Sequence, residues 1–551
     1  MHGKPFALAA LACLCLTRPA IAADRAKTQV PPATLDALDA LFARNVSRST
    51  PGCAVGVRRG EVEAQRAYGQ ADLERDVANT ADGVFNVGSV SKQFTAAAVL
   101  LLANEGKLAL DDDVRKYLPE LPAYERPISI DQLLGHTSGL RDFRATDGLT
   151  GRDALPQNNA DVLAYAARQR GLNHAPGESH LYTNTGYALL AIIVERVGGR
   201  AFADFTSERL FKPAGMTHTQ WETDVQRLVP HRALGYTQAE PAHDGRPARF
   251  AQMPTARHVV GNGGLLSTVG DLLRWNAALQ RDAFGPELTA QLEQRTHLRN
   301  GFELDYARGV FVGSYRGLRE VQHSGYTGTY TAWLGRYPEA DLSIALLCNG
   351  DADGVTGREV ADLFLPATQQ AAATATPVAT AAPTDLSGHS GLYRNARDGR
   401  LLLLDFPDDA RLEDGRYAQG PSTYEFSAQR PDEIVRRRYG QATTWTRLPA
   451  STPDASALPE YAGVYESDEL LARYEVRVAG SQLMVAVQGL SDISVPLRPL
   501  ARDVFLALGV DIPIEFQRDK AGRVVRLWLS PNQLRALAFE RVDVAKPAAS
   551  R

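Results

Sequence analysis

Ser89 and Lys92 stand three residues apart at the start of an apolar segment with the pattern of a helix. On a helix this spacing places both side chains on one face, about one turn apart. A serine hydroxyl becomes a nucleophile when a neighbouring base takes its proton, and a lysine held neutral by burial can be that base. Of the eight lysines in the chain, only Lys92 has a serine three residues before it. The spacing therefore indicates nucleophilic catalysis by Ser89 with Lys92 as its proton partner.

A second polar group, Tyr182-Thr183-Asn184, lies just before another apolar helical segment. A tyrosine near Lys92 would share its proton, since an adjacent ammonium favours the phenolate. Asn184 offers an amide that can orient either the substrate or the lysine. The same residues are also typical of a helix N-terminus beside a packed tyrosine, and a Tyr-x-Asn triplet recurs at Tyr393.

The third group is His323-Ser324-Gly325, which leads into two β-rich runs with the pattern of a hairpin. His-x-Gly recurs at His243 and His389, but only the copy at His323 opens a hairpin inside the mixed helix and strand region. A glycine at position 325 lets the strand backbone approach a bound substrate closely. Without the other two groups, His323 would be interpreted as a surface histidine on an edge strand.

These three groups, in this order along the chain, resemble the motifs of β-lactamases and penicillin-binding proteins. The sequence is similar to the class C β-lactamase branch, which includes D-alanyl-D-alanine carboxypeptidases, D-aminopeptidases and related esterases. Segments 85–88, 133–140 and 261–265 also resemble that family, and the likeness covers about residues 33–365.

The resemblance implies an acyl-serine mechanism in which Ser89 attacks a carbonyl while Lys92 and Tyr182 shuttle the proton. Asn184 and His323 would hold the substrate. The backbone amides of Ser89 and of Tyr326, the residue after Gly325, would form the oxyanion hole. Such acyl transfer needs only side chains and amides, so no cofactor is expected.

One departure concerns the substrate, because His323 stands where most β-lactamases carry lysine. A neutral imidazole binds a substrate carboxylate less well than an ammonium does. The combination of a His-x-Gly motif and two appended β units resembles the arrangement in D-aminopeptidases. In that family a loop of the C-terminal module reaches the active site and helps select a free amino terminus.

We therefore expect hydrolysis of an amide next to a D-residue, or of a small ester, in a small-molecule or peptide substrate that includes peptidoglycan fragments. β-Lactamase activity and promiscuous carboxylesterase activity are alternatives within the class. A non-catalytic sensor of peptidoglycan fragments is the alternative from another class.

The elements around these motifs predict an α+β domain with one antiparallel sheet. A strand pair is expected over 54–68, helices over 89–105 and 185–197, and a β-hairpin over 330–337 and 342–348. After the linker only short strands and turns are expected, over 400–406, 423–428, 433–438, 443–448, 473–478, 482–487, 504–508, 514–517, 524–529 and 536–541.

The chain of 551 residues is too long for one core and divides at composition changes. We predict a signal peptide over 1–22, the hydrolase domain over 23–366 and an Ala/Thr/Pro linker over 367–384. Two β modules follow, over 385–449 and 457–545. Both open alike, with Gly391-Leu392-Tyr393 and Gly463-Val464-Tyr465, which indicates a duplicated antiparallel unit forming one or two small barrels.

The first residues have the order of a secretory signal: Lys4, an apolar run over 6–16, and small residues at 20–22. A run of this length is too short for a membrane span, which needs about 20 residues, and no later segment is long enough. A lipid anchor at Cys13 or Cys15 is an alternative that fits the usual lipobox order poorly. We expect a periplasmic or secreted protein.

Charge and cysteine content exclude other classes of function. The formal net charge is −4 with no long basic block, so no nucleic-acid partner is expected. No Cys or His cluster has zinc-site spacing, so no metal is expected. The resemblance places the first and last strands of the sheet side by side, which makes a disulfide between Cys53 and Cys348 conceivable. Two buried free thiols are the interpretation that we favour.

Overall fold

A computed structural model describes residues 30–146, 149–150, 157–242, 246–253, 258–350, 355–365, 386–406, 416–419, 422–427, 429–488, 494–509, 512–529, 534 and 537–542. The expected signal peptide and the expected linker over 367–384 lie outside these described residues. Within them, no helix is long and apolar enough to cross a membrane.

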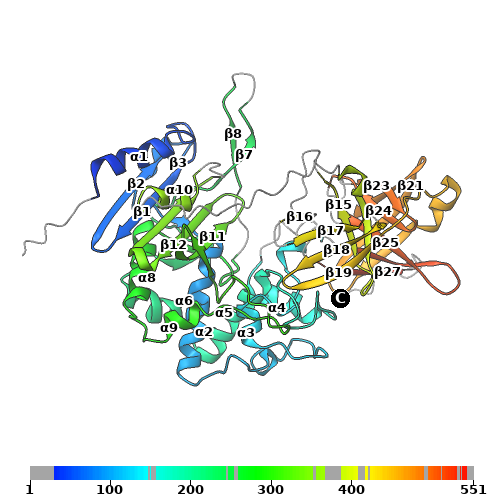
Figure 1. The fold of residues 1–551 in the computed structure, drawn as a ribbon, viewed down its shortest axis with the longest axis horizontal. Coiled ribbons are helices and arrows are strands. Elements are labelled where there is room, and N and C mark those ends of the chain that lie inside the picture. Colours follow the sequence, from blue (N-terminus) through cyan, green and yellow to red (C-terminus); the bar gives the residue numbers. More distant parts are fainter. Residues whose placement is uncertain are drawn as a thin grey trace, which may run out of the picture.

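The hydrolase domain is built on one antiparallel sheet, as expected (Figure 1). Its strand order is β10-β11-β12-β13-β1-β2, so strands from the two ends of the domain meet in its middle. The strands are β1 (Cys53–Arg59), β2 (Val62–Tyr68), β10 (Phe311–Tyr315), β11 (Leu318–Tyr326), β12 (Thr331–Tyr337) and β13 (Leu342–Cys348). The expected strand pair and the expected hairpin are both present.

The pairing of β1 with β13 sets Cys53 directly opposite Cys348. The two residues form a disulfide that spans 295 residues of sequence. Our preference for two free thiols is therefore wrong. The amino-acid pattern located both strands, but it did not set their register, and the register is what brings the two sulfur atoms together.

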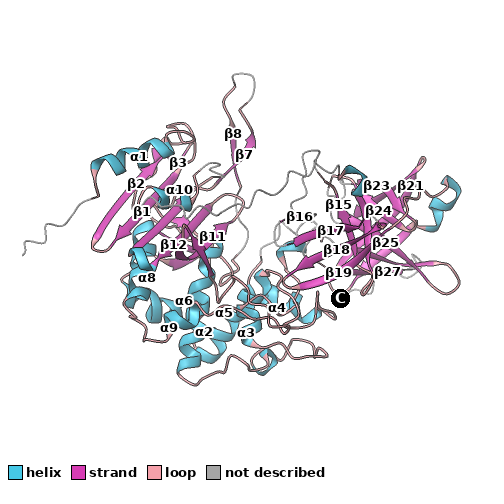
Figure 2. Cartoon of the chain, viewed as in Figure 1, coloured by secondary structure: helices cyan, strands magenta, loops and turns pink. Residues whose placement is uncertain are grey.

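Helices cover both faces of this sheet (Figure 2). Cys53, Val55 and Val57 of β1 pack with α1 (Pro32–Phe42) and α10 (Gly357–Asp362) on one face. Ala54 points to the opposite face, as the two-residue period of a strand requires. That second face is covered by α2 (Lys92–Asn104), α5 (Asn184–Gly198) and α8 (Val269–Gln280), whose apolar side chains form the largest core cluster.

The two helices that carry the expected motifs begin and end close to their expected limits. A 3₁₀ turn, η1 (Gly88–Ser91), precedes α2, so Ser89 lies in that turn and Lys92 opens the α-helix. Gly106 follows α2 with φ of 69°, and Gly199 caps α5 with φ of 66°. Glycine adopts this left-handed conformation without the strain that a Cβ would bring, so both helices stop there.

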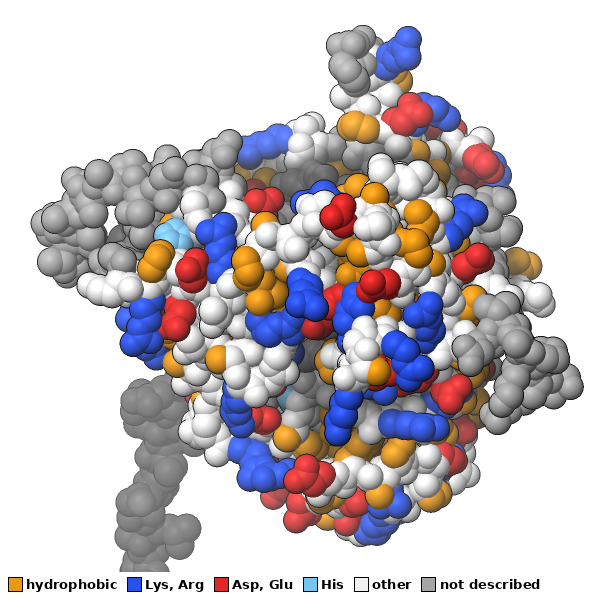
Figure 3. Space-filling view, turned by 90° about the vertical axis from the view of Figure 1, so that its right-hand side faces the viewer, with side chains coloured by type: hydrophobic (Ala, Val, Ile, Leu, Met, Phe, Trp, Pro, Cys, Tyr) orange, Lys and Arg blue, Asp and Glu red, His pale blue; other side chains and the backbone are white. Residues whose placement is uncertain are grey.

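The C-terminal part is built mainly of strands, as expected, with short 3₁₀ turns at 387–389 and 455–460. The first β module is a six-stranded sheet of order β15-β14-β19-β18-β17-β16 in the described residues, and the second is a closed barrel of β20 to β27. The first module comprises β14 (Gly391–Asn395), β15 (Leu401–Leu404), β16 (Arg416–Gln419), β17 (Ser422–Ser427), β18 (Arg430–Arg438) and β19 (Gln441–Arg447). The barrel comprises β20 (Gly463–Ser467), β21 (Ala472–Ala479), β22 (Gln482–Val487), β23 (Ser494–Ala501), β24 (Val504–Ala507), β25 (Ile512–Arg518), β26 (Val524–Leu529) and β27 (Leu537–Val542). On the face of these modules that Figure 3 shows, acidic and basic side chains are interspersed.

Matching contacts in the two modules support the hypothesis of a duplicated unit. Tyr393 and Tyr465 each donate a hydrogen bond of 2.7 Å to the backbone carbonyl four residues before them. Arg447 and Arg541, each from the last strand of its module, donate to backbone carbonyls just before the first strand. The same residue types therefore close both units in the same way.

Candidate active site

Ser89 and Lys92 meet as their spacing predicts. The Nζ of Lys92 lies 3.0 Å from the Oγ of Ser89. Two further oxygen atoms surround the amine, the side-chain oxygen of Asn184 at 3.0 Å and the backbone oxygen of Asn262 at 2.6 Å. Ser89 is half-buried, whereas Lys92 has no exposed surface. The hydroxyl is therefore within reach of solvent and substrate, while its proton acceptor is shielded.

Burial controls the charge of this lysine. Desolvation holds the pKa of Lys92 well below its ordinary range, because an ammonium without water is costly. Asp142 acts in the opposite direction, since its carboxylate favours the ammonium and raises that pKa. A neutral amine one helical turn from a serine hydroxyl can accept its proton during attack on a carbonyl.

Asp142, which was not among the expected site residues, orients Asn184. The Oδ2 of Asp142 accepts hydrogen bonds from the backbone N–H of Asn184 and, at 3.0 Å, from its Nδ2. Because the amide nitrogen faces Asp142, the amide oxygen is directed at Lys92. Asp142 lies two residues after the 133–140 segment and is 1% exposed, but no sequence pattern linked it to Asn184.

Asn262 also contacts Lys92 but was not among the expected site residues. It belongs to the 261–265 segment, which was expected only to resemble the family. Its backbone oxygen accepts from Lys92, and its own Nδ2 lies 3.4 Å from the Oδ1 of Asn184. Only the fold brings residue 262 beside residue 92, so its spacing along the chain carried no signal.

Tyr182 lies against Lys92, as expected, but not as a phenolate. Its ring centroid is 4.7 Å from the Nζ of Lys92. Burial raises the pKa of Tyr182 above its ordinary value, and the nearby Ser89 hydroxyl opposes this only in part. The expectation that a lysine ammonium would favour the phenolate is wrong, because burial disfavours charge on both groups. The Tyr182 hydroxyl is buried and makes no hydrogen bond of ordinary geometry within the described residues.

The expected oxyanion hole depends on two glycines where β11 touches the turn η1. A Cβ on Gly325 would lie 2.1 Å from the backbone oxygen of Val87 and 3.2 Å from the backbone nitrogen of Ser89. A Cβ on Gly88 would lie 2.7 Å from the backbone nitrogen of Tyr326. The amides of Ser89 and Tyr326 thus come together only because both positions lack a side chain.

His323 stands beside Tyr182 with both ring nitrogens directed at protein atoms. Its Nδ1 lies 2.5 Å from the backbone oxygen of Ser324, and its Nε2 lies 3.4 Å from the hydroxyl of Tyr306. Burial, with Lys92 nearby, lowers the pKa of His323 to about 3, so the ring is neutral. The expected substrate-binding role of His323 stays a prediction, and the observed contacts make it a neighbour that supports Tyr182.

Tyr306 also joins His323 to His136, a residue of the 133–140 segment. The backbone N–H of Thr183 donates to the Nδ1 of His136, so the ring proton of His136 lies on Nε2. That Nε2 is 3.0 Å from the Tyr306 hydroxyl, which can in turn donate to His323. The directions of these hydrogen bonds are consistent from Thr183 to Ser324 and fix the tautomers of both histidines.

The first β module reaches this network through the turn between β18 and β19. The hydroxyl of Tyr439 lies 3.1 Å from the Nδ1 of His180, two residues before Tyr182. Gln441 donates to the backbone oxygen of Glu178 at 2.8 Å. A hairpin of the C-terminal module therefore contacts the loop that carries Tyr182.

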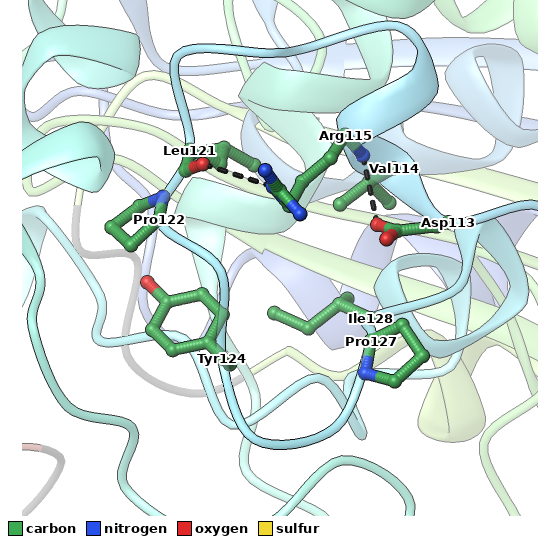
Figure 4. Close-up of a pocket in the computed structure, with 8 residues that line it drawn as sticks. All are labelled: Asp113, Val114, Arg115, Leu121, Pro122, Tyr124, Pro127 and Ile128. Carbon is green, nitrogen blue, oxygen red and sulfur yellow. Dashed lines mark hydrogen bonds between the residues drawn. The ribbon is translucent and has the colours of Figure 1, made fainter.

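Another cavity of the domain lacks this chemistry. It lies beside the segment from Asp113 to Ile128, where Arg115 donates to the backbone oxygen of Leu121 at 3.2 Å (Figure 4). No serine, lysine or histidine lines it. Among the described residues, no group of three or more His, Cys, Asp or Glu side chains is placed to hold a metal ion.

The family model described as Beta-lactamase matches residues 35–369, more than half of the chain. The chain belongs to the β-lactamase family. This family assignment and the geometry around Ser89 make it a β-lactamase-family serine hydrolase. A second model, Domain of unknown function (DUF3471), matches residues 447–541, which include the barrel.

Relatives of this β-lactamase-family protein are penicillin-binding proteins and D-aminopeptidases. Penicillin-binding protein 4* of Bacillus subtilis is 30% identical over 319 residues, which is 55% of this chain and 68% of the relative. The D-aminopeptidase of Brucella ovis is 27% identical over 527 residues, covering 89% of this chain and 96% of the relative. The second relative thus extends through the C-terminal modules.

Solved structures of similar fold include an octameric penicillin-binding protein homologue from Pyrococcus abyssi, with a TM-score of 0.52 and 20% identity over 92% of this chain and 99% of that one. The D-amino acid amidase of Ochrobactrum anthropi SV3 gives a TM-score of 0.51 and 22% identity over 60% of this chain and 98% of that one. These likenesses confirm the expected α+β fold of the catalytic domain.

Proposed function

We propose that this protein is an exported hydrolase that cleaves an amide beside a D-amino acid, or a related small ester, through an acyl-serine intermediate. The observation that carries the chemistry is the 3.0 Å contact between the Lys92 amine and the Ser89 hydroxyl, made in a buried environment that disfavours the ammonium. The similarity to D-aminopeptidases over 89% of the chain supports the substrate class.

In the proposed reaction, Ser89 attacks the substrate carbonyl as Lys92 takes the hydroxyl proton. The carbonyl oxygen gains negative charge and is stabilised by the amides of Ser89 and Tyr326. Tyr182 donates its phenolic proton to the leaving amine or alcohol and receives the proton held by Lys92, so both groups return to their neutral state. The leaving group departs and the acyl group stays on Ser89. Water, activated by the same groups, then hydrolyses the ester and restores the serine.

A substrate panel tests this function. Purified protein is assayed with a D-alanyl p-nitroanilide, its L-alanyl counterpart, nitrocefin and a p-nitrophenyl ester. We expect the D-anilide to be preferred over the L-anilide, and Ser89→Ala to abolish turnover. Ser324→Ala is the matched control and should keep its activity. This serine lies in the His-x-Gly motif, but its side chain is exposed on the face of β11 opposite to the buried His323.

Intact-mass spectrometry with a reactive acyl donor tests the covalent step. An adduct on the wild-type protein that maps to Ser89 supports the mechanism, whereas an adduct elsewhere contradicts it. Preference for the p-nitrophenyl ester over both anilides would favour the carboxylesterase alternative. Turnover of nitrocefin above the other compounds would favour the β-lactamase alternative, and the complete absence of an adduct and of turnover would favour a non-catalytic sensor.

A further inference from the structure

A cavity of about 290 Å³ lies where the hydrolase domain meets the first β module, outside the group of residues around Ser89. The loop at residues 173–179, which leads to Tyr182, forms one wall. Residues of β14, β18 and β19 and of the turn after β14 form the other. Its charged lining comprises four arginines and two carboxylates: Arg397, Arg400, Arg436, Arg438, Glu178 and Asp398.

The alternation of β18 directs two of these arginines into the cavity. Arg436 and Arg438 are two residues apart and share one face of the strand. Arg437, between them, points to the other face and donates to Glu425 at 2.8 Å. The strand thus separates two cavity arginines from one that is already paired.

The carboxylates of the cavity do not neutralise Arg436 and Arg438. Asp398 binds Arg400, and Glu178 lies 3.5 Å from Arg397. Arg436 contacts the Ser422 hydroxyl, and Arg438 lies over the ring of Tyr439. Within the described part of the chain, no carboxylate lies at ion-pair distance from Arg436 or Arg438.

Two buried donors in this lining also have no acceptor among the described residues. The Oδ1 of Asn395 accepts from the backbone nitrogens of Arg397 and Asp398, but its Nδ2 makes no hydrogen bond, although Asn395 is 2% exposed. The Nε of Arg438 is in the same condition. A buried donor without an acceptor costs free energy that a bound acceptor would recover.

The electrostatics of the cavity agree with this pattern. Burial lowers the pKa of Arg436, and repulsion from Arg438 and Arg400 lowers it further, while Tyr424 acts in the opposite direction. Positive groups are therefore held close together without enough negative charge between them.

We propose that this cavity is a binding site for an anionic group, either a carboxylate or a phosphate, on a small ligand. Guanidinium groups present paired N–H donors that match the oxygens of both anions. The unpartnered Asn395 amide and the Arg438 Nε would donate to the same group. Arg438 directly precedes Tyr439, which contacts His180, so the ligand would sit against the hairpin and the loop that adjoin Tyr182.

Direct binding tests the site without relying on the proposed hydrolase activity, because it is measured in Ser89→Ala protein. Calorimetric titrations use inorganic phosphate and succinate, with succinamide as the uncharged match for succinate. We expect both anions to bind, succinamide not to bind, and Arg436→Gln/Arg438→Gln to weaken anion binding at least tenfold, since charge-assisted hydrogen bonds are lost. Arg437→Gln, on the opposite face of β18, should bind as the parent does.

Two results would overturn the proposal. The first is no heat of binding with either anion at about 10 mM, a concentration that detects millimolar affinity. The second is equal anion affinity in the parent and the double variant. Circular dichroism and melting temperature establish that each variant is folded before its titration is interpreted.

A charge inserted into the cavity gives an independent measurement. Asn395→Asp keeps the oxygen that accepts from the backbone and adds a carboxylate among the arginines. We expect the melting temperature to rise in the parent background, to rise less or to fall in the Arg436→Gln/Arg438→Gln background, and anion binding to be lost. An equal change of melting temperature in both backgrounds would mean that residue 395 does not interact with these arginines, and would contradict the proposal.

Kinetics distinguish a carboxylate carried by the substrate from a separate anion. If the cavity holds part of the substrate, phosphate should raise the KM of a peptide substrate bearing a distal carboxylate and leave that of a neutral p-nitrophenyl ester unchanged. A separate anion should affect both substrates alike. These assays rest on the proposed activity, so their failure alongside successful titration would contradict the hydrolase and leave the anion site supported.

Discussion

Asp142 holds Asn184 through both its backbone and its side-chain nitrogen, and so directs the Asn184 amide oxygen at the Lys92 amine. Asp142 therefore acts on Lys92 in two ways. Its hydrogen bonds fix the amide that faces the amine, and its charge raises the pKa of that amine against the effect of burial.

Asp142→Asn removes the charge while leaving an oxygen that can accept from Asn184. We expect the acidic limb of the kcat/KM profile to move to lower pH. Asp142 favours the ammonium, so without its charge the lysine stays neutral in more acidic solution. At high pH, kcat/KM should fall about tenfold, since Asn184 loses a hydrogen bond to a charged acceptor. Asp204→Asn, at an exposed position on α6 (Phe202–Thr206), is the control. An acidic limb that moves to higher pH would contradict this role.

Tyr182→Phe separates proton transfer from packing. The phenol oxygen is buried, and its contact with the Ser89 hydroxyl is not a hydrogen bond of ordinary geometry, so removing it should change the melting temperature little. If the hydroxyl passes the proton, kcat should fall by about 10²–10⁴-fold, the usual contribution of a general acid or base.

Tyr187→Phe is the comparison for this experiment, since Tyr187 also lies beside Lys92 but donates to the backbone oxygen of Leu134 at 2.8 Å. It should lower the free energy of unfolding by about 1 kcal/mol and reduce kcat much less. Nearly full activity in Tyr182→Phe would exclude Tyr182 as the proton carrier.

Gly325→Ala tests the close approach between β11 and the nucleophile turn. Its Cβ would meet the backbone oxygen of Val87 at 2.1 Å, so the strand must move away and take the Tyr326 amide with it. The loss of one oxyanion donor lowers kcat by about 10²–10³-fold. Gly313→Ala on β10 has open space around its added Cβ and should change neither kcat nor melting temperature. Equal kinetics in the two variants would refute the assignment of the Tyr326 amide.

The catalytic pair was predictable because its geometry is local. Three residues on a helix always place Ser89 and Lys92 side by side, whatever the rest of the fold does. Asp142 and Asn262 reach the amine only through tertiary structure, and neither has a spacing that marks it. The disulfide was missed for the same reason, since it depends on the register between β1 and β13.

In the β modules, the pattern of residues predicted most strands but not all of them. Ten strands after the linker were expected near their observed positions, because alternating apolar residues and turns marked them. The strands β14, β16, β20 and β23 were not expected. In β23, Pro496 and Pro499 interrupt the alternating pattern. Closure of the second module into a barrel depends on the pairing of β20 with β27. This contact joins strands far apart in the sequence, so no local pattern of residues predicts it.

The disulfide between Cys53 and Cys348 should stabilise the hydrolase domain. It closes a loop of 295 residues, and a cross-link of this kind typically contributes about 2–5 kcal/mol. We expect dithiothreitol to lower the melting temperature of the wild-type protein and to have no effect on Cys53→Ala/Cys348→Ala. In protein that begins at Ala23, thiol titration after unfolding without reductant should detect no thiol. Two reactive thiols per chain would contradict the bond.

Lys92→Met tests whether the amine is neutral in the folded protein. A lysine whose pKa is depressed by folding binds a proton more readily after unfolding, so lower pH favours the unfolded state. The stability of the wild type relative to Lys92→Met should therefore decrease as the pH falls from about 10.4 toward the folded pKa. The slope should be about 1.4 kcal/mol per pH unit, one proton per chain. Chemical unfolding of both proteins at several pH values measures this difference, and the exposed Lys107→Met should show no such slope. A difference that is independent of pH would mean that Lys92 is an ammonium in the folded state, and the base for Ser89 would then have to be another group.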